Sequence, residues 1–271
     1  MKRILLFSIS FSVANVFAQE LKLETGKRIT SITNTSVKMD MGMGGQMKID
    51  GNTTNLIEIT GADNKNYNAK STTVKMKLMQ DGMGQTVSFD SDKKEDRETV
   101  AGKEMSKMLD VPATVIIDKY TGKVTETNKK VIIADETNPM ASLMGNANSA
   151  EASTAAVFFY IPNGKKVGDK WSESVNEAGM KGLKNFELQS IVANVATIAI
   201  KTKSNGTILK EAQGMKFEIA MDGTGDGVII VDTKTFLVKK STLNNDVNGT
   251  LDMMGQSVPL TIKSTANSVF Q

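Results

Sequence analysis

Short runs in which apolar and polar residues alternate dominate the sequence from Leu21 onward. In the first of them Val37, Met39, Met41 and Met43 fall at every second position. Side chains of a strand point alternately to the two faces of a sheet, so this period indicates strands with one apolar and one hydrated face. Similar runs are Val74-Met76-Leu78, Phe186-Leu188, Ile198-Ile200, Phe217-Ile219-Met221 and Val258-Leu260-Ile262. The chain is therefore expected to be mainly β and antiparallel.

Glycine-containing pairs between the runs predict the turns. They are Asp81-Gly82, Thr121-Gly122, Asn205-Gly206 and Asn248-Gly249. Three further tips share a Met-Gly signature, at Met43-Gly44, Met83-Gly84 and Met254-Gly255. Glycine supplies the positive φ that tight hairpins need. We interpret these three as hairpin tips rather than as sites.

Two segments depart from the strand pattern. Lys94 to Leu109 has apolar residues near helical spacing among many charges and predicts a short amphipathic helix. Asn138 to Phe159 begins with Asn-Pro and is rich in Ala, Ser and Met, which indicates a partial helix or a linker. One or two short helices are expected.

The two halves of the chain can be aligned with each other. Leu23–Ser31 matches Lys165–Glu173, and Val115–Val124 matches Ile229–Val238. We expect two related β-meander halves, although two short matches do not separate a duplication from the general likeness of meanders. The predicted boundaries are 19–130 for the first half, 131–163 for a helical or linker segment and 164–271 for the second half.

The first 18 residues have the order of a secretory signal peptide. Lys2 and Arg3 precede an apolar run from Ile4 to Val13, and Val16-Phe17-Ala18 forms a small-residue cleavage site. The run is too short to span a bilayer. We expect 1–18 to be cleaved and the mature chain to be periplasmic or extracellular, with peripheral association with the envelope as an option.

Composition argues against several classes of function. The formal charge of +3 includes Lys2 and Arg3, and only three residues are arginines, so nucleic acid is not expected as a partner. Cysteine and histidine are absent, which removes the usual nucleophilic triads and zinc sites. No phosphate-binding glycine loop is present. We expect no catalysis and no cofactor.

Two metal-binding patterns remain as alternatives. In the run Met39–Met47, Met39, Met41 and Met43 fall on one strand face with Met47 close by, and they resemble the M-x-M-x-M motif of Met-rich carriers of Cu(I), a soft ion that accepts thioether ligands. Methionine also simply fills apolar faces, and the 17 methionines are spread over the chain. Asp222 to Gly227 matches the start of a calcium loop, but Thr233 stands where the closing glutamate belongs. A glycine-rich hairpin explains that segment better.

The segment Val167-Gly168-Asp169-Lys170-Trp171 carries a resemblance to a family. With Gly26, the Ile117-Asp118 to Val124 turn, and the later Gly223-x-Gly225 and Val231-Asp232, it resembles an uncharacterised family of exported Bacteroidota proteins, known as a domain of unknown function. Thr235-Phe236 departs from the glycine common at that turn. The resemblance implies no catalytic residues.

Two meanders with short helices are also similar to the periplasmic lipoprotein-carrier fold, a curved antiparallel sheet or half-barrel around an apolar cavity. That similarity implies an exported carrier of an acyl chain, lipid or other apolar ligand. The expected lining residues are Met39, Met41, Met76, Leu78, Phe217, Ile219 and Trp171, all of which also suit a plain core. A structural or interaction module of the envelope without a small ligand is the alternative.

Overall fold

A computed structural model describes residues 20–271 except 43–44, 83, 128–148, 178, 213–214 and 254–255. The predicted signal peptide, the three Met-Gly tips in part, and most of the predicted helical linker therefore lie outside the described residues. None of the described helices has the length and apolar character needed to cross a membrane.

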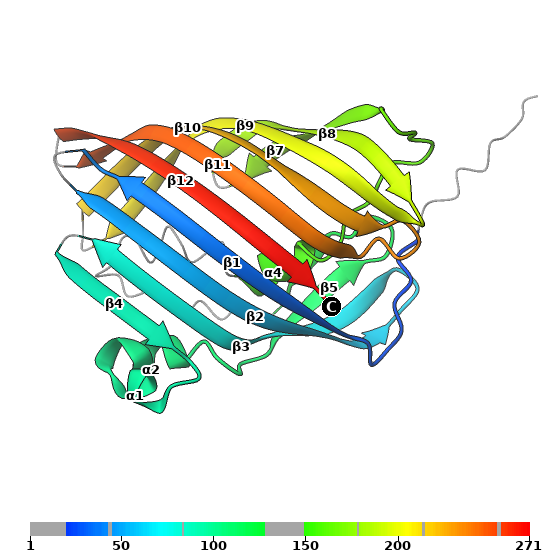
Figure 1. Ribbon diagram of the computed structural model, residues 1–271, viewed down its shortest axis with the longest axis horizontal. Helices are drawn as coiled ribbons and strands as arrows, with labels where there is room; N and C mark the ends of the chain where they lie inside the picture. The colour runs from blue at the N-terminus through cyan, green and yellow to red at the C-terminus, as the bar shows by residue number, and fades with distance from the viewer. Residues whose placement is uncertain are drawn as a thin grey trace, which may run out of the picture.

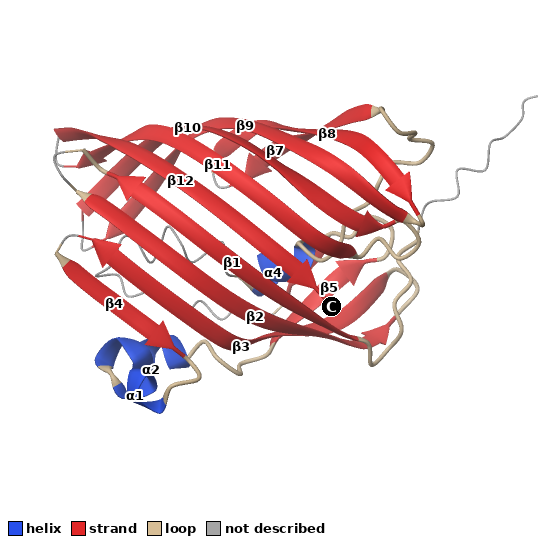
Figure 2. Cartoon of the chain, in the orientation of Figure 1, coloured by secondary structure: helices blue, strands red, loops and turns tan. Residues whose placement is uncertain are grey.

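The described strands form one open antiparallel sheet of 12 strands, with three short helices beside it (Figures 1 and 2). The strand order is β6-β5-β3-β2-β1-β12-β11-β10-β9-β8-β7, and β4 pairs with β3. The first-half strands are β1 (Arg28–Asp40), β2 (Gln46–Ala62), β3 (Asn66–Gly82), β4 (Gln85–Asp90), β5 (Ala113–Asp118) and β6 (Val124–Glu126). The second-half strands are β7 (Lys170–Glu177), β8 (Met180–Val192), β9 (Val195–Ala212), β10 (Met215–Asp232), β11 (Val238–Met253) and β12 (Gln256–Phe270). The prediction of a mainly β, curved antiparallel sheet is confirmed.

The two halves repeat each other in local geometry. Gly26 and Gly168 both have positive φ, 87° and 94°, directly before the first strand of their half. The N–H of Gly26 donates to the carbonyl of Ile59, and the N–H of Gly168 donates to that of Leu188, both at 2.7 Å. A bulge follows each acceptor, between Ile59 and Gly61 and between Leu188 and Ser190. The strands β1-β2-β3 thus correspond to β7-β8-β9.

The next strand differs between the halves because the first half carries an insertion. β9 pairs with one continuous strand, β10, whereas β3 pairs with β4 near its end and with β5 near its start. Residues 91–112 interrupt what is a single strand in the second half. They hold α1 (Lys94–Glu98) and α2 (Val100–Ser106), which lie in the stretch predicted to be an amphipathic helix.

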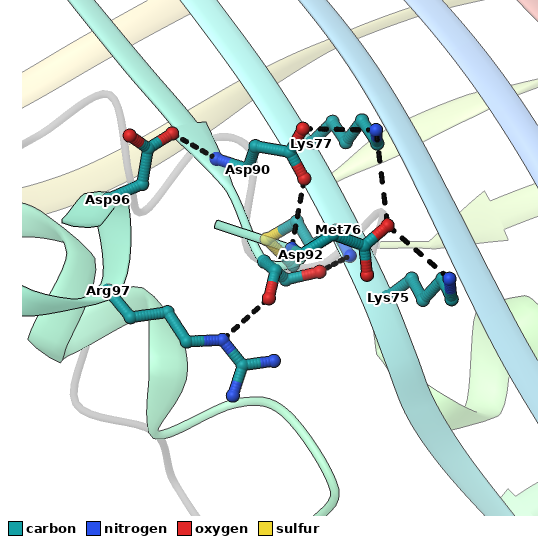
Figure 3. Close-up of polar contacts among 8 residues, drawn as sticks. Lys75, Met76, Lys77, Asp90, Asp92, Asp96 and Arg97 are labelled. Atoms are coloured by element: carbon teal, nitrogen blue, oxygen red, sulfur yellow. Dashed lines mark hydrogen bonds and ion pairs between the residues drawn. The ribbon is translucent and has the colours of Figure 1, made fainter. Parts of the chain in front are cut away.

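Backbone-directed hydrogen bonds fix α1 to the sheet (Figure 3). The carboxylate of Asp96 accepts from the N–H of Asp90 at 2.8 Å, and Nε of Arg97 donates to the carbonyl of Ser91 at 2.6 Å. The hydroxyl of Ser91 accepts from the N–H of Met76 at 3.0 Å. The insertion is therefore tied to both β3 and β4.

The inner face of the rolled sheet packs on α4 (Ala150–Ala155) and on residues 157–161, which together we call the plug. Around the plug lies the plug-end core, which includes Ile57, Ile117, Leu188, Ile198 and Val231, all fully buried. Figure 1 shows α4 behind β1 and β12, on the concave side. Strands from both halves thus share one core.

Tyr160 of the plug contacts both Asp-led turns. Its ring stacks on Phe236 with centroids 4.8 Å apart, and its hydroxyl donates to the carbonyl of Lys119 at 2.7 Å. A Cβ placed on Gly122 would lie 2.5 Å from Cε2 of the Tyr160 ring. We call the concave channel formed by the inner face of the curved sheet the trough. The plug closes the end of the trough where the two turns meet.

Two predicted turns are wrong. Asn205-Gly206 lies inside β9 and Asn248-Gly249 inside β11. By register both glycines face the inner side, as do other mid-strand glycines at Gly51, Gly182, Gly223, Gly225 and Gly227. Side chains converge on the concave face of a curved sheet, and glycine relieves that crowding. A Cβ on Gly206 would run into the backbone of Gly179.

The segment Asp222 to Gly227 is neither a hairpin nor a calcium loop. It lies in the middle of β10, where the register with β9 and β11 continues without a break. Asp222, Thr224 and Asp226 all point to the outer face, while the glycines between them take the inner positions. An extended strand cannot wrap its side chains around one ion as the calcium loop does.

Candidate functional site

A second apolar cluster lies on the inner face at the opposite end of the strands from the plug. Its buried members are Met39, Met47, Ile49, Ile219 and Leu260. Partly buried residues pack against them, namely Val37, Met41, Leu78, Met221, Leu251 and Ile262. We call this set the tip cluster because it lies beside the hairpin tips that join β1 to β2 and β11 to β12. Along β10, Met221 of the tip cluster and Ile229 of the plug-end core are eight residues apart, which corresponds to about 26 Å of extended strand.

Every described member of the tip cluster except Met41 lies in a strand. Its members come from β1, β2, β3, β10, β11 and β12 and from Met41 next to β1, and none comes from a described helix or from the plug. Curvature brings them together, since β2 and β10 are four steps apart in the sheet. The partly buried members leave apolar surface accessible along the cluster. This arrangement can hold an apolar molecule by contact area alone.

The structure brings together four of the seven predicted lining residues. Met39, Met41, Leu78 and Ile219 belong to the tip cluster. Met76 lies opposite Thr53 on the inner face, nearer the middle of the trough, and is not a member. Phe217 pairs with Met253 in the register of β10 and β11, and its side chain lies outside the described residues.

Trp171 lies at the other end of the molecule. Its ring stacks on Phe186 with centroids 5.3 Å apart and is 6.4 Å from Phe159, beside the plug-end core. Its Nε1 is buried and has no hydrogen-bond partner among the described residues. Trp171 therefore packs with the core and does not share a surface with the tip cluster.

Four of the residues in the tip cluster are methionines. Met39 and Met47 face each other across β1 and β2, so their side chains lie side by side on the inner face. Met41 and Met221 pack against the same cluster. Unbranched thioether side chains adapt their shape to varied apolar partners, and they are also the ligands that Cu(I) accepts. Met43, the third methionine of the predicted copper motif, lies outside the described residues.

A hollow of about 540 Å³ lies on the outer face beside α1. Ser36, Asp50, Met79 and Ser88 form one cross-strand row of its floor; Asn34, Asn52, Lys77 and Asp90 form another. These polar groups largely satisfy one another, with Ser36 donating to Asp50 and Asn52 to Asn34, both at 2.7 Å.

The charges in this outer hollow are also paired. The hydrogen bond to Asp90 raises the pKa of Lys77, with Nζ and Oδ2 3.0 Å apart. The N–H of Asp92, followed by Lys77, holds the pKa of Asp90 below its usual value. Hydrogen bonds from Lys48 and then Ser36 lower the pKa of Asp50. The polar and charged groups of both rows are thus mostly paired with one another on a hydrated surface. The concave face is therefore the stronger candidate site.

Sequence reasoning missed a part of the tip cluster. Ile49 and Leu251 were not selected. Met47 was noted only as the end of the possible copper run, and Leu260, Ile262 and Met221 were assigned to strands but not to a site. The signal was present, because each occupies the apolar position of an alternating run. Alternation identifies the face of a strand but not which strands curve toward each other.

Comparison with known proteins assigns the family. A model of DUF6263, a family of unknown function, matches residues 64–238. The chain belongs to this family. The match covers more than half of the sequence and includes β3, the insertion, the plug and β7 to β10. The expected membership of a family of unknown function is confirmed.

Solved structures resemble the chain only distantly. A structure titled for lipid–protein interactions in lipovitellin is 11% identical, with a TM-score of 0.49, and the match covers 92% of this chain and 25% of that one. The chain thus spans about a quarter of the lipovitellin chain. OpdQ of Pseudomonas aeruginosa is 6% identical with a TM-score of 0.25, over 92% of this chain and 99% of that one. The translocator domain of the autotransporter NalP from Neisseria meningitidis is 8% identical with a TM-score of 0.24, and the match covers 91% of this chain and 89% of that one. No curated protein matches the sequence.

Proposed function

We propose that the protein is an exported, non-catalytic binding or carrier protein that holds an apolar ligand such as an acyl chain against the tip cluster. One observation carries the proposal. Among the described residues, the tip cluster is an apolar surface formed by six strands and by Met41 beside β1, at the end of the trough away from the plug. The plug-end core has its own helix and loop to fill it, whereas the tip cluster has partly buried methionine and leucine on an adaptable surface.

Ligand binding is tested with protein that has been stripped of lipid. Native mass spectrometry before and after stripping, together with titration of an apolar fluorescent naphthylamine dye, measures occupancy and affinity. Leu251→Asn places an amide in the tip cluster and is expected to weaken dye binding about tenfold, because apolar contact is lost and a polar group must be desolvated. Leu183→Asn makes the same change at an exposed position of β8 and is the matched control.

Circular dichroism and thermal unfolding establish that both variants fold. Leu251→Ala supplies a second variant if the amide disturbs the fold. A protein that carries no lipid from its source and ignores the dye contradicts the carrier proposal and favours a structural module of the envelope.

Export is part of the proposal. We expect cleavage after Ala18, so that the mature chain begins at Gln19 and resides in the periplasm or outside the cell. Intact-mass measurement of the protein from the periplasmic and medium fractions checks this. Recovery of the chain only in the cytoplasm with residues 1–18 retained contradicts it.

Binding of Cu(I) is a second candidate, favoured by the neighbouring thioethers of Met39 and Met47. Titration against a chromophoric Cu(I) chelator, with the combined Met39→Leu, Met41→Leu and Met43→Leu variant as comparison, separates the two functions. Leucine keeps the apolar surface but removes the sulfur ligands. Loss of copper retention with dye binding intact supports copper, and equal behaviour of the two proteins rejects it.

A further inference from the structure

One lysine lies on the concave face of the sheet. The register of β8 and β9 places Lys184 opposite Thr202, on the face that carries the buried Phe186. Lys184 is partly buried. No other described side chain at the inner positions between the tip cluster and the plug-end core is a cation, because the lysines of the central strands take outer positions. A single described cation therefore faces this part of the trough.

Lys184 has no ionic partner in the part of the chain that the structure describes. The carboxylate opposite it in the register is Glu173 of the edge strand β7, and the two side chains form no ion pair. Glu173 is exposed to solvent, whereas Lys184 is partly buried. Glu126, which faces inward on the edge strand β6, does not pair with Lys184 either. Taking an ammonium group partly out of water without a counter-charge is unfavourable, so this position favours a ligand that brings a negative charge.

Two further donors in the same corner of the inner face lack acceptors among the described residues. The hydroxyl of Thr202, directly across the ladder from Lys184, donates to and accepts from no other group there. Trp171 pairs with Phe186, two residues from Lys184, and its buried Nε1 has no hydrogen-bond partner. An ammonium, a hydroxyl and an indole N–H can all donate, and an ionised carboxylate or phosphate presents acceptors. The donors of this corner therefore suit an anionic group.

The inner face between Lys184 and the tip cluster has room for an acyl chain. Gly182 and Met180 hold the inner positions of β8 before Lys184, and all three are partly accessible. The register then joins Met180 through Gly206 to Met221, which packs on the tip cluster. Four residues of β8 span about 13 Å and two strand steps about 10 Å, so the line from Lys184 to Met221 is about 16 Å. An acyl chain covers about half of a hydrocarbon core of about 30 Å, which is a matching length.

We infer that the ligand is an amphiphile with an anionic head, a carboxylate or a phosphate, that lies at Lys184 while its acyl chain runs past Met180 onto the tip cluster. This inference rests on the proposed function and specifies the class of ligand at the same site. Lys184 selects the head by its charge, and Thr202 adds a hydroxyl donor. Glu173 at the exposed rim limits the selectivity, because its negative charge opposes an anion bound beside it.

The test compares four ligands with the same saturated chain and different heads. Palmitate, hexadecyl phosphate, monopalmitoylglycerol and hexadecylamine each compete with the naphthylamine dye for lipid-free protein, at neutral pH and below the concentrations at which they form micelles. Both anionic ligands are expected to bind about tenfold more tightly than the neutral one, because a charge-assisted hydrogen bond replaces water at Lys184. Tighter binding of hexadecyl phosphate indicates a phospholipid and tighter binding of palmitate a free fatty acid, and either agrees with the inference.

Variants at this corner show whether Lys184 carries the preference. Lys184→Met keeps the length of the side chain and removes its charge, so palmitate and monopalmitoylglycerol should bind alike, whereas Lys184→Arg should keep the preference. Glu173→Gln should tighten binding of both anionic ligands about two- to threefold. Lys181→Met makes the same change as Lys184→Met on the exposed outer face of β8 and is the matched control. Circular dichroism establishes that each variant folds, and Lys184→Gln replaces Lys184→Met if the latter does not.

Three results overturn the inference but leave the carrier function standing. They are equal affinity for anionic and neutral heads in the unmodified protein, a preference for hexadecylamine, and a preference for anions that survives Lys184→Met or is lost equally in Lys181→Met. Failure of every ligand and of the dye overturns the carrier function itself, and the inference with it.

Discussion

Gly122 and Phe236 occupy the same position in two equivalent turns, four residues after Asp118 and Asp232. Both have positive φ, 67° and 57°. Each preceding aspartate accepts from backbone N–H groups two and three residues later, at 2.9 and 2.8 Å for Asp118 and at 2.9 and 3.0 Å for Asp232. The glycine leaves space for the ring of Tyr160, and the phenylalanine stacks on it, so the two turns make complementary contacts with the same side chain.

Gly122→Ala is expected to lower the free energy of unfolding by about 2–4 kcal/mol. Its cost combines a left-handed backbone with a Cβ 2.5 Å from Cε2 of Tyr160. Gly164→Ala is the control, because that residue also has positive φ, 79°, but no atom lies within 4 Å of an added Cβ. Urea unfolding of both variants measures the difference. Equal losses would mean that Tyr160 does not restrict the turn.

Acid should destabilise the protein through the two turn aspartates. Burial acts to raise the pKa of Asp232, but hydrogen bonds from Thr235 and Lys234 outweigh it and hold that pKa below the ordinary 3.8. The pKa of Asp118 is lowered in the same way by Thr121 and Tyr120 against burial. A lowered pKa in the folded state contributes stability above the unfolded value, and that contribution is lost as the pH falls through the folded value.

Asp232→Asn keeps an oxygen for the turn and removes the titrating group. Its stability should therefore fall less steeply than that of the unmodified protein when the pH drops below about 3.8. Thermal unfolding over this pH range is the measurement. Asp252→Asn changes an exposed carboxylate with no hydrogen bond from the described residues and serves as control. Parallel curves for Asp232→Asn and the unmodified protein would contradict the prediction.

Gly227→Ala tests the role of glycine in the curvature of the sheet. An added Cβ would meet the backbone oxygen of Thr242 and would lie 2.8 Å from Cδ2 of Leu243, so a loss of about 1–3 kcal/mol is expected. Gly61→Ala, whose nearest neighbour would be Nδ2 of Asn68 at 4.0 Å, should be neutral or slightly stabilising. Denaturant unfolding compares the two. A neutral Gly227→Ala would mean that the trough tolerates a side chain there.

Thr154→Val should stabilise the protein by about 1 kcal/mol. Oγ1 of Thr154 is buried in α4 and has no hydrogen-bond partner among the described residues. Folding therefore removes the hydroxyl from water without giving it a hydrogen bond, which lowers the free energy of unfolding. Valine has a similar shape and no polar atom. Thr121→Val is the comparison, because it removes a 2.9 Å hydrogen bond to Asp118 and should destabilise. An unchanged or lowered melting temperature for Thr154→Val would point to a partner for this hydroxyl.

Local patterns predicted much of this fold. Alternation at Met39 or Ile219 indicated the strand and its apolar face, and the Asp-Gly spacing around Asp118 and Gly122 identified a turn. The alignment of Gly26 with Gly168, and of Asp118 with Asp232, marked positions that have the same hydrogen bonding in both halves. Glycine was misinterpreted at Gly206 and Gly249, because its use on the concave face depends on curvature, which is a property of the whole sheet.

The candidate site was predicted less completely for the same reason. The sequence by itself determined which residues are apolar, which strands alternate, and that no Cys or His chemistry is available. Only the tertiary structure decided that Ile49 and Ile219 meet in one cluster, that Trp171 lies at the far end, and that Thr202 and Thr35 share the inner face between. Side-chain direction along a strand is a local property with a period of two, whereas contact across a trough depends on strand order and on the curvature that many residues produce together.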